Sequence, residues 1–235
     1  MSQILHQVRT RMAITAHPDD TEFTMAGTAA KWVQEGFQVV YVICTDGSRG
    51  SNDPAFPPEK MTPIRHAEQE EAARILGVAT VVFLDYEDGT LQPSLELRRD
   101  LTRLIRRYRP DIVICGDPTV YLRNMYINHP DHRAAAEASL HAVFPSACTR
   151  FIFRELLDEG LEPHKVSEVY LYGAAEPDTG IDISAVVELK IAALKAHRSQ
   201  VRPDYAEARV REWNGELGRR HGVAFAEEFK RIVLR

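Results

Sequence analysis

Short apolar runs alternate along this chain with longer stretches of helical periodicity. Four of the runs are short enough for buried strands: residues 12–16, 38–44, 80–84 and 112–115. Apolar positions spaced three and four apart predict helices between them: residues 22–35, 64–76 and 95–108. Alternating strands and helices predict an α/β fold, a Rossmann-like open, mostly parallel sheet with helices on both faces.

The remainder of the chain continues the alternation. It predicts a fifth strand at residues 168–172 and then three helices, at residues 183–200, 205–220 and 223–233. A proline- and glycine-rich segment at residues 45–63 is expected either to cover a site or to be a surface insertion. If the first and fourth strands are neighbours, as in a 3-2-1-4-5 winding, their carboxyl ends meet at the switch point where such sheets bind ligands.

Composition limits the class of protein. We expect one domain over residues 1–235, because this length supports a single substantial core. The formal net charge of -5 gives no electrostatic case for nucleic acid as a partner. No apolar run reaches the roughly 18 residues of a transmembrane segment, and residues 1–10 lack the apolar part of a signal peptide. A cytoplasmic location is therefore expected.

The cysteines and a group of arginines have simple interpretations. Cys44, Cys115 and Cys148 lack C-x-x-C spacing, so we expect them to be free thiols in the hydrophobic core. The arginines within residues 98–109 are expected to form the solvated face of a helix.

The turn after the first strand carries three potential metal ligands within four residues. These are His17, Asp19 and Asp20 in the sequence A-H-P-D-D. The turn follows a strand's carboxyl end, where ligands collect in open α/β sheets, and is therefore a candidate metal site. The alternative is an ordinary turn in which an aspartate caps the next helix.

A similar tetrad, H-P-D-H, occupies residues 129–132 and precedes a strongly helix-forming segment. Proline is favoured at the first helical position, so His129 is predicted at the helix entrance and His132 in its first turn. Together the two tetrads can supply two imidazoles and a carboxylate to one divalent metal. Such a set leaves a coordination position open for water, as catalytic zinc sites do.

These motifs resemble those of the PIG-L/LmbE-like family of zinc-dependent N-deacetylases. The likeness spans nearly the whole chain, through A-H-P-D-D-x-E, T-D-G-S-R-G, R-x-x-E, D-G, H-P-D-H and finally K-A-H-R-S-Q. The resemblance implies a Rossmann-like fold. It also implies a metal-dependent amidohydrolase that removes acetyl groups from N-acetylglucosamine-containing substrates, with Zn²⁺ or another divalent metal such as Fe²⁺ in the cell.

By motif position, the resemblance implies zinc on His17, Asp20 and His132, with Asp19 as general base. Amide hydrolysis needs an activated water, a polarised carbonyl and a proton for nitrogen, and these roles supply the first two. The alternative for Asp19 is an aspartate that only orients a metal ligand.

The second tetrad would supply the third requirement of amide hydrolysis, the proton for the departing nitrogen. The resemblance implies that His129 stabilises the developing oxyanion or protonates the amine, and that Asp131 orients His129. A carboxylate close to His129 would favour its protonated form. Some relatives carry a tyrosine two residues before this tetrad, where this chain has Ile127 with Tyr126 beside it.

Two further positions are implied to hold sugar hydroxyls, Arg65 and Asp88. The alternative for Arg65 is an ion pair with Glu68 on one helix face, and the alternative for Asp88 is turn formation before a glycine. His197 is expected either on the solvent side of a late helix or across the mouth of the cleft.

Three classes of function follow. The favoured one is an N-deacetylase whose partner is a small N-acetylated sugar or glycoconjugate. Another metal-dependent hydrolase, such as a phosphoesterase, is disfavoured because the chain lacks a glycine-rich phosphate loop. A non-catalytic sugar- or metabolite-binding protein on the same fold is the third class. A homo-oligomer is compatible with each of them.

Overall fold

The computed structural model describes residues 9–123 and 126–235, so the expectation for residues 1–10 falls mostly outside them. The main sheet has seven strands: β1 Thr10–Thr15, β2 Gln38–Thr45, β3 Thr80–Tyr86, β4 Ile112–Gly116, β7 Glu168–Tyr172, β8 Thr179–Asp182 and β9 Ala226–Val233. Their order is β3-β2-β1-β4-β7-β9-β8. The first five pair in parallel, and β9 pairs antiparallel with both neighbours. The predicted Rossmann-like winding is confirmed.

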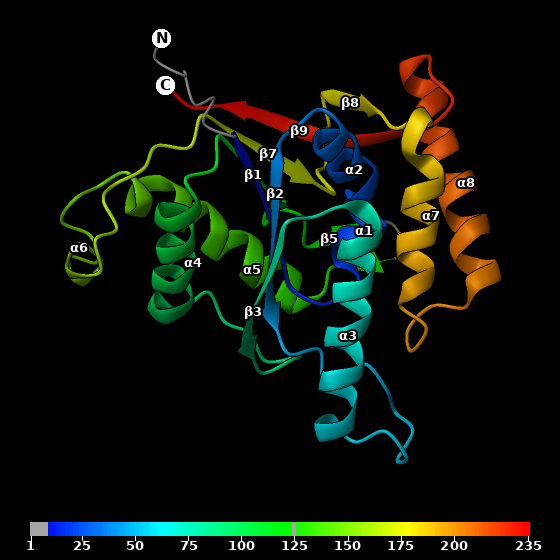
Figure 1. Cartoon of the computed structure of the whole chain (residues 1–235), viewed down its shortest axis with the longest axis horizontal. Helices are drawn as coiled ribbons and strands as arrows, with labels where there is room; N and C mark the ends of the chain where they lie inside the picture. The colour runs from blue at the N-terminus through cyan, green and yellow to red at the C-terminus, as the bar shows by residue number, and fades with distance from the viewer. Residues whose placement is uncertain (1–8, 124–125) are drawn as a thin grey trace, which may run out of the picture.

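Helices cover both faces of the sheet (Figure 1). One face carries α4 Leu95–Tyr108, α5 Pro130–His141 and the short α6 Glu155–Asp158. The other side carries α1 Asp20–Thr24, α2 Ala26–Gln34, α3 Pro58–Leu76, α7 Val187–Ala196 and α8 Pro203–His221. Single helical turns at Ala142–Ala147 and Ser184–Val186, and a small hairpin of β5 Leu122–Arg123 with β6 Tyr126–Ile127, complete the described elements.

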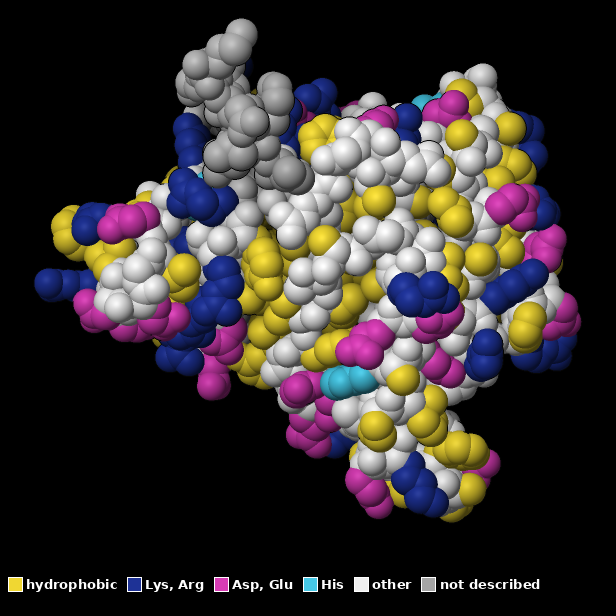
Figure 2. Space-filling view, viewed as in Figure 1, with side chains coloured by type: hydrophobic (Ala, Val, Ile, Leu, Met, Phe, Trp, Pro, Cys, Tyr) yellow, Lys and Arg dark blue, Asp and Glu magenta, His cyan; other side chains and the backbone are white. Residues whose placement is uncertain are grey.

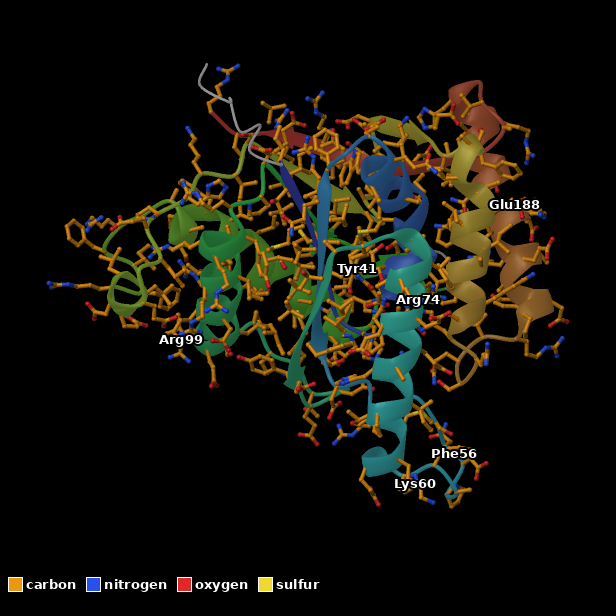
Figure 3. The ribbon with its side chains drawn as sticks, in the orientation of Figure 1. Tyr41, Phe56, Lys60, Arg74, Arg99 and Glu188 are labelled. Atoms are coloured by element: carbon orange, nitrogen blue, oxygen red, sulfur yellow. The ribbon has the colours of Figure 1, made fainter. Side chains whose placement is uncertain are left out.

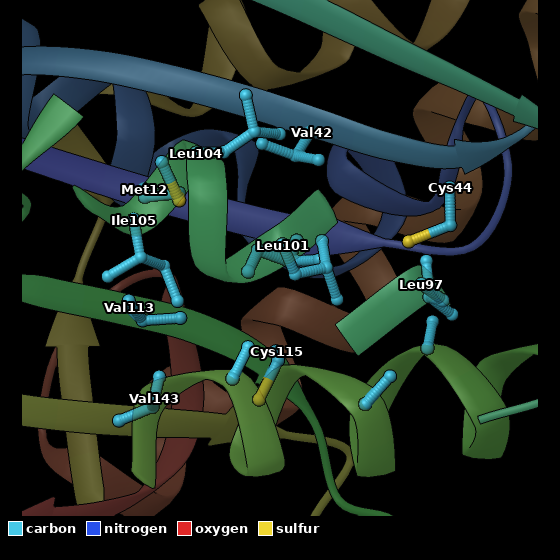
Figure 4. Packing of buried hydrophobic residues seen from close by; sticks show 14 of the residues in the cluster. Met12, Val42, Cys44, Leu97, Leu101, Leu104, Ile105, Val113, Cys115 and Val143 are labelled. Carbon is cyan, nitrogen blue, oxygen red and sulfur yellow. The ribbon is translucent and has the colours of Figure 1, made fainter. Parts of the chain in front are cut away.

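Side chains from the central strands fill the core between the sheet and α4. Met12 and Val113 lie on neighbouring strands and pack with Leu101 and Ile105 of the helix, and all four side chains are fully buried (Figure 4). Each such side chain contributes roughly 1.5–3 kcal/mol through burial. Because apolar contacts fix both β1 and β4, the loops that follow these strands start from a rigid base. Cys44 and Cys115 are buried as expected, whereas Cys148 is only partly buried and is therefore not the core residue that was expected.

The last predicted helix is wrong, because residues 223–233 contain strand β9 instead. Its glutamates, lysine and arginine favour a helix locally, but pairing with β7 and β8 on either side overrides that preference. The first predicted helix, residues 22–35, is divided into α1 and α2 at Met25.

The irregular segment after β2 is shorter than the predicted residues 45–63, since α3 begins at Pro58. Its base is buried at Gly47 and Ser48, whereas its tip at Phe56 projects away from the body of the molecule together with Lys60 (Figure 3). Whether the segment covers a bound substrate stays a prediction.

Arg106 corrects the expectation that the arginines of residues 98–109 are solvated. Its side chain is buried and donates hydrogen bonds to backbone carbonyls between α5 and β7, including those of Ser146, Thr149 and Ile152. A guanidinium carries five donors, so one arginine can satisfy several carbonyls of an irregular segment. On the face seen in Figure 2, lysines and arginines are interspersed with acidic side chains. Among the described helices, none is long and apolar enough to cross a membrane.

A buried ion pair joins β9 to the helices. Glu227 accepts hydrogen bonds from the backbone N–H groups of Gly27 and Thr28, at the start of α2. The same carboxylate lies 2.6 Å from the ammonium of Lys190, and both side chains are at most 1% exposed. Glu227 therefore caps one helix and neutralises a cation from another.

Replacing this carboxylate is expected to destabilise the fold strongly. Glu227→Ala leaves Lys190 buried without its partner, which costs about 3–5 kcal/mol in free energy of unfolding. Urea unfolding would measure the loss. Glu35→Ala, which removes the exposed pair with Lys31, is the matched control and should have little effect. Equal losses in the two variants would contradict a special role for Glu227.

Candidate metal centre and active site

The two tetrads meet at the carboxyl ends of neighbouring strands. His17 and Asp20 follow β1, and His132 lies in the first turn of α5, which follows β4. Because β1 and β4 pair directly, these side chains lie side by side although more than a hundred residues separate them in sequence. His17, Asp20 and His132 form a group suited to hold a metal ion.

The donor atoms have the spacing of a metal site. His17 Nδ1 lies 3.2 Å from His132 Nε2 and 3.6 Å from Asp20 Oδ2, and His132 Nε2 lies 3.1 Å from Asp20 Oδ1. Four tetrahedral ligands at about 2.0–2.1 Å from an ion are separated from one another by roughly 3.3 Å. The three donors therefore fit one ion with a position left for water. Although burial alone raises the pKa of Asp20, His132 and His17 lower it well below its usual value, so this ligand is ionised.

Two further carboxylates orient His17. Its Nε2 lies 3.1 Å from Asp88 Oδ1 and 3.3 Å from Asp131 Oδ2. Burial lowers the pKa of His17, but its hydrogen bonds to Asp131, Asp20 and Asp88 raise the pKa to about 12. A histidine whose outer nitrogen donates to a carboxylate presents the other nitrogen to a metal, and here that nitrogen is Nδ1.

Asp131 is fully buried, and its closest hydrogen-bond partners belong to the loop after β3 rather than to His129. The carboxylate accepts hydrogen bonds from the backbone N–H groups of Gly89, at 2.7 Å, and Leu91, at 3.2 Å, whereas His129 Nδ1 is 4.0 Å away. The side chain thus faces His17 and the loop after β3 more closely than it faces His129. The predicted orientation of His129 by this carboxylate stays a prediction.

His129 is the N-cap of α5, where its Nδ1 accepts a hydrogen bond from the backbone N–H of Asp131. Burial and the neighbouring His17 lower the pKa of His129. Asp131 raises the pKa of His129, as expected of a nearby carboxylate, but burial and His17 lower it by more, so the net shift favours the neutral ring. With Nδ1 accepting, the neutral ring carries its proton on Nε2.

Asp19 has an unusual backbone and a carboxylate that caps no helix. Its φ of 102° is in the left-handed region, which is costly for a residue with a side chain. The carboxylate lies 3.3 Å from a nitrogen of Arg65, and burial raises its pKa against the opposing effect of that guanidinium. The alternative, that Asp19 is an ordinary aspartate that caps the next helix, is wrong, because no side chain caps α1.

Arg65 and Asp88 support this turn and the loop after β2. Arg65, 4% exposed, donates to the carbonyls of Pro18 and Gly47 in addition to pairing with Asp19. The alternative of a pair with Glu68 is wrong, because Glu68 accepts hydrogen bonds from Ser199 instead. Asp88 accepts from the backbone N–H of Arg49 at 2.9 Å. Their contact with sugar hydroxyls stays a prediction.

Sequence reasoning missed a buried chain of hydrogen bonds behind Asp19. The backbone N–H of Asp19 donates to Gln69 Oε1 at 3.0 Å, and Gln69 Nε2 donates to Glu22 Oε2 at 3.1 Å. The same Glu22 oxygen lies 3.0 Å from His197 Nε2. His197 is thus fully buried, which neither expected placement described. The one feature of the sequence that could have pointed to a role for Gln69 is its position four residues after Arg65, on the same helix face.

This chain of contacts predicts a positioning role for Gln69. Gln69→Leu removes the acceptor that holds the Asp19 backbone, so we expect kcat to fall roughly 10- to 100-fold with little change in KM or metal content. Steady-state kinetics and elemental analysis measure these effects. Gln34→Leu, at the exposed end of α2, is the matched control. An unchanged kcat in Gln69→Leu would exclude the role.

A cavity of about 520 Å³ opens beside the candidate metal ligands. Asp20 and His132 form part of its wall, Asn128 and Tyr126 contribute from the loop before α5, and Tyr172 from the end of β7. Tyr126 is about half exposed and is therefore free to contact a ligand, whereas Ile127 lies in the same exposed hairpin. Whether Tyr126 replaces the tyrosine that some relatives carry stays a prediction.

Comparison with known proteins agrees with this geometry. Residues 12–143 match the family model described as "PIG-L: GlcNAc-PI de-N-acetylase". Diacetylchitobiose deacetylase of Thermococcus kodakarensis is 34% identical over 88% of this chain and 76% of its own. The structure of N,N'-diacetylchitobiose deacetylase from Pyrococcus horikoshii, complexed with its inhibitor MPG, superposes with a TM-score of 0.88 at 34% identity, over 97% of this chain and 85% of that one.

The same fold also occurs in an enzyme that catalyses a different reaction. GalB, the 4-carboxy-2-hydroxymuconate hydratase from Pseudomonas putida KT2440, superposes with a TM-score of 0.78 at 21% identity, over 97% of this chain and 98% of that one. This likeness is one of fold alone. The family model covers more than half of this chain, and both of its His/Asp tetrads lie within the matched residues. The chain therefore belongs to the PIG-L family of GlcNAc-PI de-N-acetylase-like proteins.

Proposed function

We propose that this protein is a zinc-dependent N-deacetylase that hydrolyses the acetamido group of an N-acetylglucosamine-containing small molecule. One observation carries the proposal: His17, Asp20 and His132 present three donors to one point, and the carboxylate of Asp19 follows the same strand without serving as a helix cap. The relatives' names supply the substrate class, since those given above share the N-acetylglucosamine unit.

Zinc is the metal that this donor set favours. Two imidazoles and one carboxylate with an open position are typical of catalytic zinc. When bound, the ion lowers the pKa of a coordinated water to about 7 and polarises the carbonyl of the amide. The protein holds the donor atoms in place. Asp88 and Asp131 do this for His17, because their carboxylates contact its Nε2 and leave Nδ1 facing the other two donors.

Asp19 accepts the proton of the attacking water. Its carboxylate is fixed by Arg65 on one side and its backbone by Gln69 on the other, so the acceptor needs no rearrangement before the reaction. Proton transfer by a positioned carboxylate typically contributes 10²- to 10⁴-fold in rate.

His129 stabilises the oxyanion that forms when water adds to the amide carbonyl. Its Nδ1 accepts the backbone N–H of Asp131, so the neutral ring offers the N–H of Nε2 as a donor. This geometry favours a hydrogen-bond donor over a proton-delivering acid. The proton that Asp19 takes from water is then the one available to the departing amine.

Free amine and acetate released from a panel of N-acetylated sugars would test the proposal. We expect the metal-loaded protein to deacetylate at least one N-acetylglucosamine-containing member of the panel. Hydrolysis of a phosphate ester with none of an amide would favour a phosphoesterase. Binding without any turnover would favour the binding-protein alternative and contradict the proposal.

A further inference from the structure

One motif of the sequence, K-A-H-R-S-Q at residues 195–200, has no place in the proposed function. It spans the end of α7 and the turn that follows, beside α1 and α3 (Figure 1). Ser199 donates to Glu68 of α3 from its backbone N–H, at 2.8 Å, and from its hydroxyl, at 2.6 Å. His197 contacts Glu22 of α1. The motif therefore ties α7 to both of the helices α1 and α3.

The carboxylate of Glu22 gathers three hydrogen-bond donors on one oxygen. Its Oε2 lies 2.7 Å from the hydroxyl of Thr21, 3.1 Å from Gln69 Nε2 and 3.0 Å from His197 Nε2. The side chains of Glu22 and His197 are both 0% exposed. A carboxylate withdrawn from water is costly unless basic or polar groups compensate it. Within the described parts of the chain, His197 is the only basic side chain at ion-pairing distance from Glu22, so it fixes where this carboxylate lies.

The carboxylate in turn decides which way the amide of Gln69 points. An ionised carboxylate only accepts hydrogen bonds, whereas an amide side chain has a donating and an accepting end. Contact with Glu22 therefore directs Nε2 of Gln69 toward the carboxylate and leaves Oε1 to accept the backbone N–H of Asp19, at 3.0 Å. The reversed amide would set two donors against each other. Because Asp19 has a φ of 102°, its turn depends on such outside support.

We propose that His197 is a positioning residue for the general base, Asp19. It fixes Glu22, which orients the amide of Gln69, and that amide holds the backbone of the turn. The inference rests on the proposed function, since it takes Asp19 to be the base. His197 is not among the residues that line the cavity beside the candidate metal ligands, so it acts on the reaction only through this chain of contacts. Its loss should therefore lower kcat and leave KM and metal content unchanged.

Two substitutions of similar polarity test the contact. In glutamine the amide nitrogen can take the place of histidine Nε2, and in asparagine that of Nδ1. Since Nδ1 of His197 has no hydrogen-bond partner among the described residues, only glutamine can preserve the bond to Glu22. His197→Asn should lower kcat roughly 10- to 100-fold at unchanged KM and metal content, and His197→Gln should retain most of the activity. Equal losses in the two variants would overturn the proposal.

His164→Asn is the matched control. His164 is partly buried and its Nε2 lies 2.8 Å from the carbonyl of Pro110, at the end of β4 away from the site, so kcat should not change. A double-mutant cycle tests the connection to the base. In Gln69→Leu protein, which already lacks the acceptor for the backbone of Asp19, adding His197→Asn should cause no further loss of kcat. Losses that multiply would show that His197 does not act through Gln69 and would contradict the proposal.

Amide exchange measures the positioning without any turnover. In metal-loaded protein, the backbone N–H of Asp19 should exchange faster in His197→Asn than in the wild type and in His197→Gln, while amides of β4 keep their rates. Acceleration of both would indicate general destabilisation and, like an unchanged rate at Asp19, would exclude the positioning role. If the wild type deacetylates no N-acetylated sugar but the expected pattern is seen, the proposed function fails and the chain of contacts stands. Should His197→Asn not fold, Glu22→Gln replaces it, because an amide at that position no longer dictates the orientation of Gln69 and should accelerate exchange at Asp19 in the same way.

Discussion

Asp20→Ala and His132→Ala proteins are expected to lose their bound metal and, with it, the hydrolysis of N-acetylated sugars. Each change removes one of the three proposed ligands, whose donor atoms lie 3.1–3.6 Å apart. Loss of an outer partner of a ligand commonly costs 10- to 100-fold in metal affinity, so loss of a direct ligand should cost more than about 100-fold. Elemental analysis of the purified proteins measures the occupancy.

A histidine outside this cluster provides the control for the metal ligands. His66 packs on Phe83 and lies 3.4 Å from Asp85, so His66→Ala should retain both metal and activity. Melting temperatures measured in parallel separate loss of the ion from loss of the fold. Full occupancy in Asp20→Ala or His132→Ala would remove that residue from the ligand set.

Asp19→Asn should keep the metal and lose roughly 10²- to 10⁴-fold in kcat. Asparagine has nearly the same size as aspartate, so the turn with its positive φ and the contact with Arg65 can persist. What disappears is the proton acceptor. Steady-state turnover, with metal content determined on the same samples, measures the effect.

This variant also distinguishes an enzyme from a binding protein. A binding protein with the same fold does not need a general base. Its ligand affinity would therefore be the same with aspartate or asparagine at position 19, and neither protein would turn over the ligand. Near-wild-type turnover in fully loaded Asp19→Asn protein would assign proton transfer to another group. Loss of metal in Asp19→Asn would instead indicate that Asp19 is itself a ligand.

The sequence predicted the winding of the sheet and the meeting of the two tetrads. Short apolar runs such as residues 39–44 and 112–115 are buried on both faces, and in a parallel sheet this makes them easy to recognise. Once β1 and β4 are neighbours, the positions of His17 and His132 follow from the handedness and direction of the strands. The meeting of these His and Asp side chains in one candidate metal site could therefore be predicted without side-chain coordinates.

Contacts between distant segments could not be predicted in this way. Strand β9 depends on pairing with β7 and β8, and Glu227 is buried only because Lys190 from α7 meets it. The contact of Gln69 with the Asp19 backbone, and the direction in which Asp131 turns, depend on tertiary geometry that no local pattern encodes. Each of these features joins residues at least 37 positions apart, where periodicity carries no information.

The central claim, that a metal held by His17, Asp20 and His132 is required for deacetylation, is tested most directly by titrating metal back into the metal-depleted enzyme. Acetate release from N,N'-diacetylchitobiose should be abolished by depletion and should rise linearly with added Zn²⁺ until about one ion per chain is bound. Deacetylation by the depleted protein at the rate of the loaded one would contradict the account.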